Sequence, residues 1–220
     1  MKLVLASGSQ RRRELLTMCG YDYEIIVSNA DETIDENDPE SFVRALSFRK
    51  AKEVFDRLFA AGRRDFAVIG SDTVVAFQKE GETKPVIIGK PKDAKDAVRI
   101  LSMLSGKTHR VFTGVSVIAD ISDENAAAQC SIREKEEIQT ECSITEVTFE
   151  TLSPDEITDY VNSGDPLDKA GSYGIQGPFG MFVREIRGNY FTVIGMPIPV
   201  LYKMLKKIGI LPHGFYERLE

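Results

Sequence analysis

The sequence predicts an α/β protein in which a mixed, elongated β-sheet lies between layers of helices. Apolar runs rich in β-branched residues alternate with longer amphipathic stretches along most of the chain, as in α/β architectures. Two long apolar runs, 111–119 and 143–152, follow one another with no helical stretch between them. These observations favour a three-layer fold with a mixed sheet flanked by helices. The 220 residues suit one domain or a closely fused pair of lobes, and we take residues 1–220 as a single domain.

In the N-terminal half, strands are expected at 3–6, 23–27, 66–77 and 86–88, and helices at 10–19 and 39–59. Gly20 suits the end of the first helix, and the Asp38–Pro39 pair marks the start of the second. Gly70, Ser71 and Asp72 are expected to interrupt the third strand.

In the C-terminal half, helices are expected at 93–104, at 153–161 and from 199 onward, and strands at 111–119, 143–152, 181–186 and 190–194. Ser153 with Glu156 forms the pattern of a capping box at a helix start. The polar stretch 120–139 joins two strands, either as a flexible loop or as a projecting hairpin arm. Spaced glycines between 165 and 180 predict a backbone that turns tightly and approaches a ligand.

Composition indicates an acidic globular protein with a core. The formal net charge is -6, with 42% hydrophobic and 28% charged residues, so general coating of a nucleic acid polymer is not expected. No apolar run approaches the ~18 residues of a membrane span. Arginines follow the first apolar run, which is the wrong order for an export signal. Cys19, Cys130 and Cys142 lack metal-type spacing and indicate reduced thiols in a cytoplasmic protein.

The opening segment combines a strand, the small-residue loop Ser7–Ser9 and the arginines Arg11, Arg12 and Arg13. Unpaired backbone N–H groups and the helix dipole make such a loop an anion site. Arginines in the first turn oppose that dipole, but their guanidinium groups can hold phosphate in a bidentate grip. The alternative is a solvated basic face. At most two of the three arginines can face one ligand.

Lys50 falls in an apolar helical stripe with Val43, Leu46 and Val54. Burying an unpaired ammonium group costs several kcal/mol, so Lys50 is expected to meet a carboxylate or a ligand anion. The alternative is that its stem packs while its amine reaches water.

Four more residues are candidates for a cleft. Asp72 follows an apolar strand and could line a cleft, although an ordinary turn aspartate is the alternative; Glu32 could equally be a solvated carboxylate of an acidic loop. Lys90 adds a cation at a strand end, and Gln176 offers both a donor and an acceptor for a base edge. His109 and His213 are the only histidines, which disfavours histidine-rich metal sites and histidine-based triads.

Five segments in order resemble the Maf family of nucleoside-triphosphate pyrophosphatases, which are related in fold to inosine-triphosphate pyrophosphatases. The segments are LASGSQRRRELL, GSDTVV, GKP, AVRILSMLSGKTHRVFTGV and GDPLDKAGSYGIQG. The resemblance spans nearly the whole chain and implies two lobes around a cleft. It also implies cleavage between the α- and β-phosphates of a nucleoside triphosphate with Mg²⁺ or Mn²⁺, as nucleotide-pool housekeeping, and a homodimer.

The same resemblance assigns roles to the cationic candidates. Ser7, Arg11 and Arg12 match the phosphate-holding positions of the family. Lys50 and Lys90 match charged residues that complete the active-site cleft.

For the remaining candidates, the resemblance makes Asp72 the general base for the attacking water and, with Glu32, a metal-binding group. Arg11, Thr73 and Gln176 match positions that separate the dTTP/UTP branch from the branch acting on methylated guanine nucleotides. The alternatives are a pyrophosphatase for purine or methylguanine triphosphates and a regulatory nucleotide-binding protein of cell division with weak catalysis. Gln10 stands where the family usually has proline. Proline would fix the start of the helix, so glutamine at this place would loosen the arginine geometry.

Overall fold

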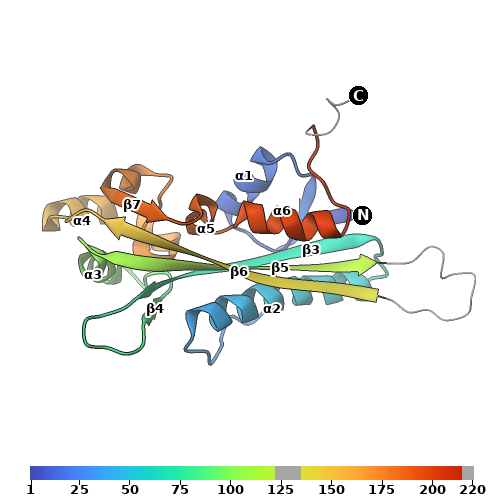
Figure 1. Cartoon of the computed structure of the whole chain (residues 1–220), viewed down its shortest axis with the longest axis horizontal. Helices are drawn as coiled ribbons and strands as arrows, with labels where there is room; N and C mark the ends of the chain where they lie inside the picture. Colours follow the sequence, from blue (N-terminus) through green and yellow to red (C-terminus); the bar gives the residue numbers. More distant parts are fainter. Residues whose placement is uncertain (122–134, 215–220) are drawn as a thin grey trace, which may run out of the picture.

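The structure is built on one long, twisted β-sheet with helices on both faces (Figure 1). The computed structural model describes residues 1–121 and 135–214. Its strands are β1 (Lys2–Leu5), β2 (Tyr23–Ile25), β3 (Phe66–Phe77), β4 (Val86–Ile88), β5 (Thr108–Ile121), β6 (Lys135–Phe149) and β7 (Val183–Arg187). Its helices are α1 (Gln10–Met18), α2 (Pro39–Ala60), α3 (Ala94–Leu104), α4 (Pro154–Asn162), α5 (Tyr190–Ile194) and α6 (Ile198–Lys207), with the short 3₁₀ helices η2 (Asp165–Asp168), η3 (Ala170–Ser172) and η4 (Pro178–Phe182).

The sheet is mixed, which confirms the prediction. The described strands form a 7-stranded sheet in the order β2-β1-β3-β5-β6-β7, with β4 also paired to β3. β1 pairs in parallel with β2 and β3, whereas β3, β5, β6 and β7 pair with one another in antiparallel order. The long antiparallel strands form the spine on which both ends of the molecule are built.

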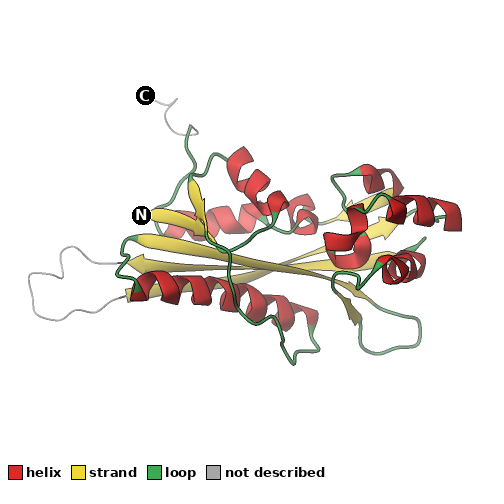
Figure 2. Ribbon diagram, turned by 180° about the vertical axis from the view of Figure 1, so that it is seen from behind, coloured by secondary structure: helices red, strands yellow, loops and turns green. Residues whose placement is uncertain are grey.

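Helix α2 covers one face of this spine at close range. A Cβ atom on Gly70 would lie 2.1 Å from the carbonyl oxygen of Ser47, and one on Gly114 would lie 2.1 Å from that of Val43. Only glycine lets two backbones approach so closely. The opposite face carries α1 and α6, whose buried leucines pack on the same strands (Figure 2). The predicted three layers are therefore confirmed.

The far end of the spine carries a second core. Side chains from α3, α4 and the 3₁₀ segments pack there around Phe149, Tyr173 and Phe179. Phe149 makes edge-on ring contacts with both of the others, at centroid distances of 4.8 Å, a geometry that aromatic pairs prefer. The glycine-rich segment is thus held by its own aromatic residues.

Most predicted helix boundaries are confirmed by their caps. Asp38 accepts a hydrogen bond from the backbone N–H of Ser41 at the start of α2, and Asp93 caps α3 in the same way. The capping box of Ser153 and Glu156 is present at α4. These short-range signals depend on a few neighbouring residues, which is why the sequence reveals them.

Two strand predictions are wrong. β3 is not interrupted at Gly70–Asp72, because the whole segment pairs with β5, Asp72 lying opposite Gly114. Residues 190–194 form helix α5 instead of a strand. Asn189 caps this helix by accepting from the N–H of Thr192, and Gly195 ends it at a φ of 110°, so the caps override the β-rich composition.

The stretch 120–139 is strand at both ends, since β5 runs to Ile121 and β6 begins at Lys135. The rest of the expected loop or hairpin arm, with Cys130, lies outside the described residues. Within the described part of the chain, no helix combines the length and apolar character that a bilayer crossing requires.

Candidate active site

A cavity of about 1610 Å³ lies beside the middle of β3, between the N-terminal segments and the glycine-rich segment. Every site residue predicted from the sequence lines it: Ser7, Arg11, Arg12, Glu32, Lys50, Asp72, Thr73, Lys90 and Gln176. The fold therefore gathers residues from α1, α2, β3, the end of β4 and the glycine-rich segment around one space, although they are scattered along the chain.

Lys50 and Asp72 form the most buried ion pair of the cavity. The Nζ atom of Lys50 lies 2.7 Å from a carboxylate oxygen of Asp72, and each side chain is 12% exposed. A carboxylate oxygen of Glu32 lies 2.9 Å from the same amine, but this side chain is 66% exposed. The ion-pair expectation for Lys50 is confirmed, and the snorkelling alternative is excluded.

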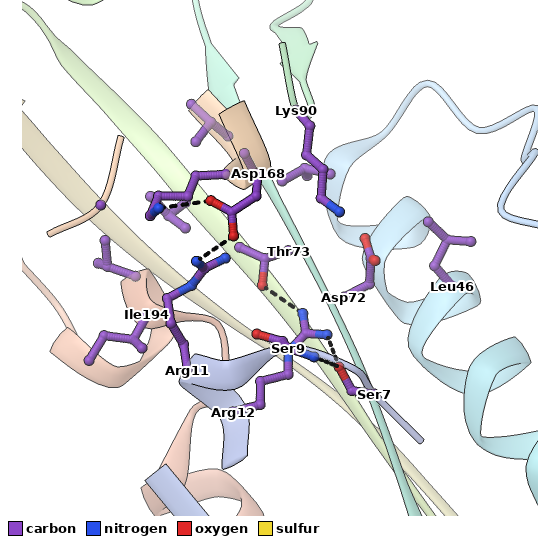
Figure 3. A pocket seen from close by; sticks show the side chains of 18 of the residues that line it. Ser7, Ser9, Arg11, Arg12, Leu46, Asp72, Thr73, Lys90, Asp168 and Ile194 are labelled. Atoms are coloured by element: carbon purple, nitrogen blue, oxygen red, sulfur yellow. Dashed lines mark hydrogen bonds and ion pairs between the residues drawn. The ribbon is translucent and has the colours of Figure 1, made fainter. Parts of the chain in front are cut away.

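Strand alternation places the two neighbouring residues of β3 on different sides of the sheet. Asp72 faces Lys50 on α2, whereas Thr73 faces the first helix and lies near Arg12 (Figure 3). One strand therefore supplies both a carboxylate and a hydroxyl to the cavity. Asp72 reaches the cavity from the middle of a strand and not from the end that the sequence had indicated.

Arg12 is fixed by contacts with three separate segments. Its Nε donates to the carbonyl of Gly195 at 2.9 Å, one Nη donates to Ser7 Oγ at 3.0 Å, and the other lies 3.5 Å from Thr73 Oγ1. Burial lowers the pKa of Arg12 from its ordinary value, and the charge of Asp72 opposes that shift. Arginine stays protonated in proteins, so Arg12 is a fixed cation beside the Ser7–Ser9 loop.

The other two arginines differ from it. Arg11 extends toward the end of the sheet that carries the second core, where its Nη1 donates to Asp168 at 3.1 Å (Figure 3). Arg13 does not line the cavity, which agrees with at most two arginines serving one ligand. It is half-buried and donates to the carbonyl of Gly8 at 3.0 Å.

Lys90 and Gln176 stand at the mouth of the cavity with their polar groups available. Both side chains are exposed, and neither has a hydrogen bond or ion pair within residues 1–121 and 135–214. Lys90 extends from the end of β4 toward Asp72 (Figure 3). Lys90, which follows β4, thus offers an ammonium group to a ligand, and Gln176, in the glycine-rich segment, offers an amide.

Gln10 begins helix α1 in the place of the proline expected there. Its amide donates to Glu14 one turn later at 2.9 Å. Ser7 Oγ accepts the backbone N–H of Ser9 at 3.2 Å, so the loop is tied before the helix starts. With glutamine at this place, Arg12 contacts Gly195 and Ser7.

Asp72 and Glu32 have the donor chemistry for a divalent cation. Mg²⁺ in nucleotide enzymes is commonly held by one or two carboxylates together with substrate phosphates. Two carboxylates that share one amine within 2.9 Å fit that requirement. Among the described residues, no group of three or more histidine, cysteine or acidic side chains forms a complete protein cage for a metal.

Asp168 is a site residue that the sequence did not reveal. It lines the cavity beside Lys169 and holds Arg11. Its position directly before a lysine in the glycine-rich segment was the available signal, but the partner lies 157 residues away along the chain.

Comparison with known proteins finds a family and relatives that match nearly the whole chain. Residues 2–208 match a family described as Maf-like protein. A protein named dTTP/UTP pyrophosphatase from Agathobacter rectalis is 40% identical over 217 residues, covering 95% of this chain and 98% of that protein. One of the same name from Bacillus thuringiensis subsp. konkukian is 42% identical over 210 residues, covering 95% and 96%.

Among solved structures, the Ham1 protein of Staphylococcus aureus covers 94% of this chain and 100% of its own, with a TM-score of 0.46 and 15% identity. A likeness at that level bears on neither activity nor substrate. The family match and the two relatives each span almost the whole chain. They show that this chain belongs to the Maf family.

Proposed function

We propose that this protein hydrolyses dTTP and UTP to the nucleoside monophosphate and pyrophosphate. One observation supports this above all: a single cavity holds a buried, lysine-paired carboxylate together with a set of cations that faces it. A triphosphate brings several negative charges, which the cations can balance. The carboxylate supplies what phosphate binders lack, a group that can take a proton from water.

The cations divide into a fixed and an adjustable part. Arg12 is held by the backbone of Gly195 and by Ser7, so it offers a preset charge beside the opening loop. Lys90 is exposed and can adjust to the phosphate chain. Preset charges stabilise a transition state more than mobile ones because they need no reorganisation during the reaction.

Asp72 would act as the general base for the attacking water. Lys50 holds this carboxylate at 2.7 Å, which fixes its direction. A positioned base of this kind contributes ~10²–10⁴-fold in rate. Lys50 is then a positioning residue for Asp72 and an additional cation for the substrate.

Asp72 and Glu32 would hold a Mg²⁺ or Mn²⁺ ion brought in with the substrate. When bound, such an ion neutralises phosphate charge and polarises the phosphoryl group under attack. The lysine shared by the two carboxylates balances them until then.

The pyrimidine preference is supported by the names of the two relatives and by Gln176, an exposed residue of the cavity lining. An amide can both donate to and accept from a base edge. The reaction would remove unwanted triphosphates from the cytoplasmic nucleotide pool.

A panel of canonical and modified triphosphates tests this proposal. Each would be incubated with the protein and Mg²⁺ or Mn²⁺, and pyrophosphate release would be measured. We expect the highest kcat/KM for dTTP and UTP. Greater turnover of purine or methylguanine triphosphates would refute the pyrimidine assignment, and tight calorimetric binding of dTTP without turnover would favour the regulatory alternative.

A further inference from the structure

Asp168 divides its carboxylate between two cations. One oxygen accepts from Arg11 Nη1 at 3.1 Å, and the other accepts from Lys169 Nζ at 2.8 Å. Burial alone would raise the pKa of this carboxyl, but the hydrogen bond from Lys169 and the charge of Arg11 outweigh it and hold the pKa below its usual range. Asp168 is therefore charged at neutral pH and can bind both cations at once.

The lysine partner is itself rigidly held. Lys169 is 13% exposed, and its amine also contacts the backbone carbonyl and the carboxylate of Asp165, at 2.5 and 3.0 Å. Tyr160 donates to the other Asp165 oxygen at 2.5 Å and accepts from the N–H of Gly174 at 3.0 Å. A Cβ atom on Gly174 would lie 2.6 Å from the Lys169 side chain, so the backbone of Gly174 packs closely against this lysine.

Arg11 has no other anchor in the described part of the chain. Its side chain is 29% exposed, and Nη1 alone is engaged. The remaining guanidinium nitrogens are free, and a guanidinium group can grip a phosphate through two of them. One contact with Asp168 is thus compatible with a second contact to substrate.

We propose that Asp168 is a positioning residue for the phosphate grip. It holds Arg11 across the cleft before the substrate arrives and keeps that contact while the other guanidinium nitrogens bind phosphate. This inference rests on the proposed function, because it assigns Arg11 to the triphosphate. Ordering a long arginine side chain in advance lowers the entropy cost of binding.

Charge balance argues against the opposite role, in which Asp168 would compete with the substrate for Arg11. The two carboxylates of the network, Asp165 and Asp168, face two cations, Arg11 and Lys169. The network is therefore neutral and adds no net repulsion toward a triphosphate. What it determines is the position of the Arg11 guanidinium group.

The test is a double-mutant cycle on KM and kcat for dTTP, with wild type, Arg11→Ala, Asp168→Asn and the double variant. In the wild-type background we expect Asp168→Asn to raise KM by about 2- to 5-fold, the range of a partly exposed ion pair, with kcat unchanged. In the Arg11→Ala background it should have no effect. Asp159→Asn, an exposed aspartate on α4 outside the cavity lining, is the matched control and should match wild type.

Asp168→Ser serves as a second variant in case the amide introduces a contact of its own. A lower KM, a fall in kcat at constant KM, or an equal effect with and without Arg11 would each overturn the inference. If wild type hydrolysed no triphosphate, the proposed function would fail separately. The same cycle, run on calorimetric binding of inorganic tripolyphosphate, would then decide the role of Asp168.

Discussion

Replacing Lys50 by methionine tests how the buried carboxylate is maintained. The change removes the ammonium group but keeps an unbranched apolar side chain in the stripe of α2. Asp72 then loses its partner at 2.7 Å while remaining 12% exposed. Glu32, at 66% exposure, can turn to water and contributes little, since exposed pairs are worth about 0–1 kcal/mol.

The size of the effect follows from the Lys50–Asp72 distance. At 2.7 Å and an effective dielectric constant of about 20, the attraction is about 6 kcal/mol. Desolvation of both groups offsets part of it, and breaking a buried pair costs about 3–5 kcal/mol. Because both side chains retain some exposure, we expect Lys50→Met to lower the free energy of unfolding by about 3 kcal/mol.

Urea unfolding of Lys50→Met, Asp72→Asn and the double variant is the assay. The double variant should be more stable than the sum of the single losses implies, because the unpaired charge is gone. Lys52→Met is the matched control on the same helix. Lys52 is 34% exposed and pairs with Asp56 and Glu136, so its loss should cost less than about 1 kcal/mol. Equal losses for the two lysines, or an additive cycle, would refute the reasoning.

Three further predictions concern the surroundings of the cavity. Arg12→Lys keeps the charge but loses the contacts to Gly195 and Ser7, so KM for dTTP should rise about 10-fold or more. Arg13→Lys is the control and should leave KM unchanged. Equal effects of the two changes would contradict the phosphate-binding role of Arg12. Gly195→Ala places a side chain at a φ of 110° and a Cβ atom 3.1 Å from Thr73 Oγ1, so it should lower the free energy of unfolding in urea by about 1–3 kcal/mol. The loss should be smaller for Gly209→Ala, whose Cβ atom would meet nothing within 4 Å. A larger loss for Gly209→Ala would contradict this reasoning. Burial lowers the pKa of His109 to about 3, so below pH ~6.5 the unfolded state binds a proton that the folded state does not. The free energy of unfolding should therefore fall as the pH falls from about 6.5 toward 3, and about 2 kcal/mol of the wild-type loss between pH 7 and pH 5 should vanish in His109→Gln. An unchanged pH dependence would show that this histidine does not contribute.

Local chemistry made much of the fold predictable. The caps at Asp38, Asp93 and Ser153 involve residues at most a few positions apart. The apolar stripe of Val43, Leu46 and Val54 around Lys50 predicted that its amine meets a carboxylate or a ligand anion, or else reaches water. Each of these signals acts within about three turns of a helix, so no knowledge of tertiary structure is needed.

Long-range pairing decided the rest. Asp72 lies in an unbroken strand because β5 pairs across the glycine that seemed to interrupt it. Arg12 is fixed by the carbonyl of Gly195, 183 residues away, and Arg11 is held by Asp168 from the opposite lobe. A backbone carbonyl carries no sequence signature, and a surface aspartate resembles any other until its partner is placed beside it.

The role of Asp72 is tested most directly by the products that wild type and Asp72→Asn release from dTTP. Phosphorus NMR would separate pyrophosphate and dTMP from dTDP and inorganic phosphate in each reaction. We expect wild type to release dTMP and pyrophosphate in equal amounts, and Asp72→Asn to lose ~10²–10⁴-fold in kcat while still binding dTTP. Release of dTDP and phosphate by wild type, or undiminished turnover by Asp72→Asn, would contradict a pyrophosphatase that uses Asp72 as its base.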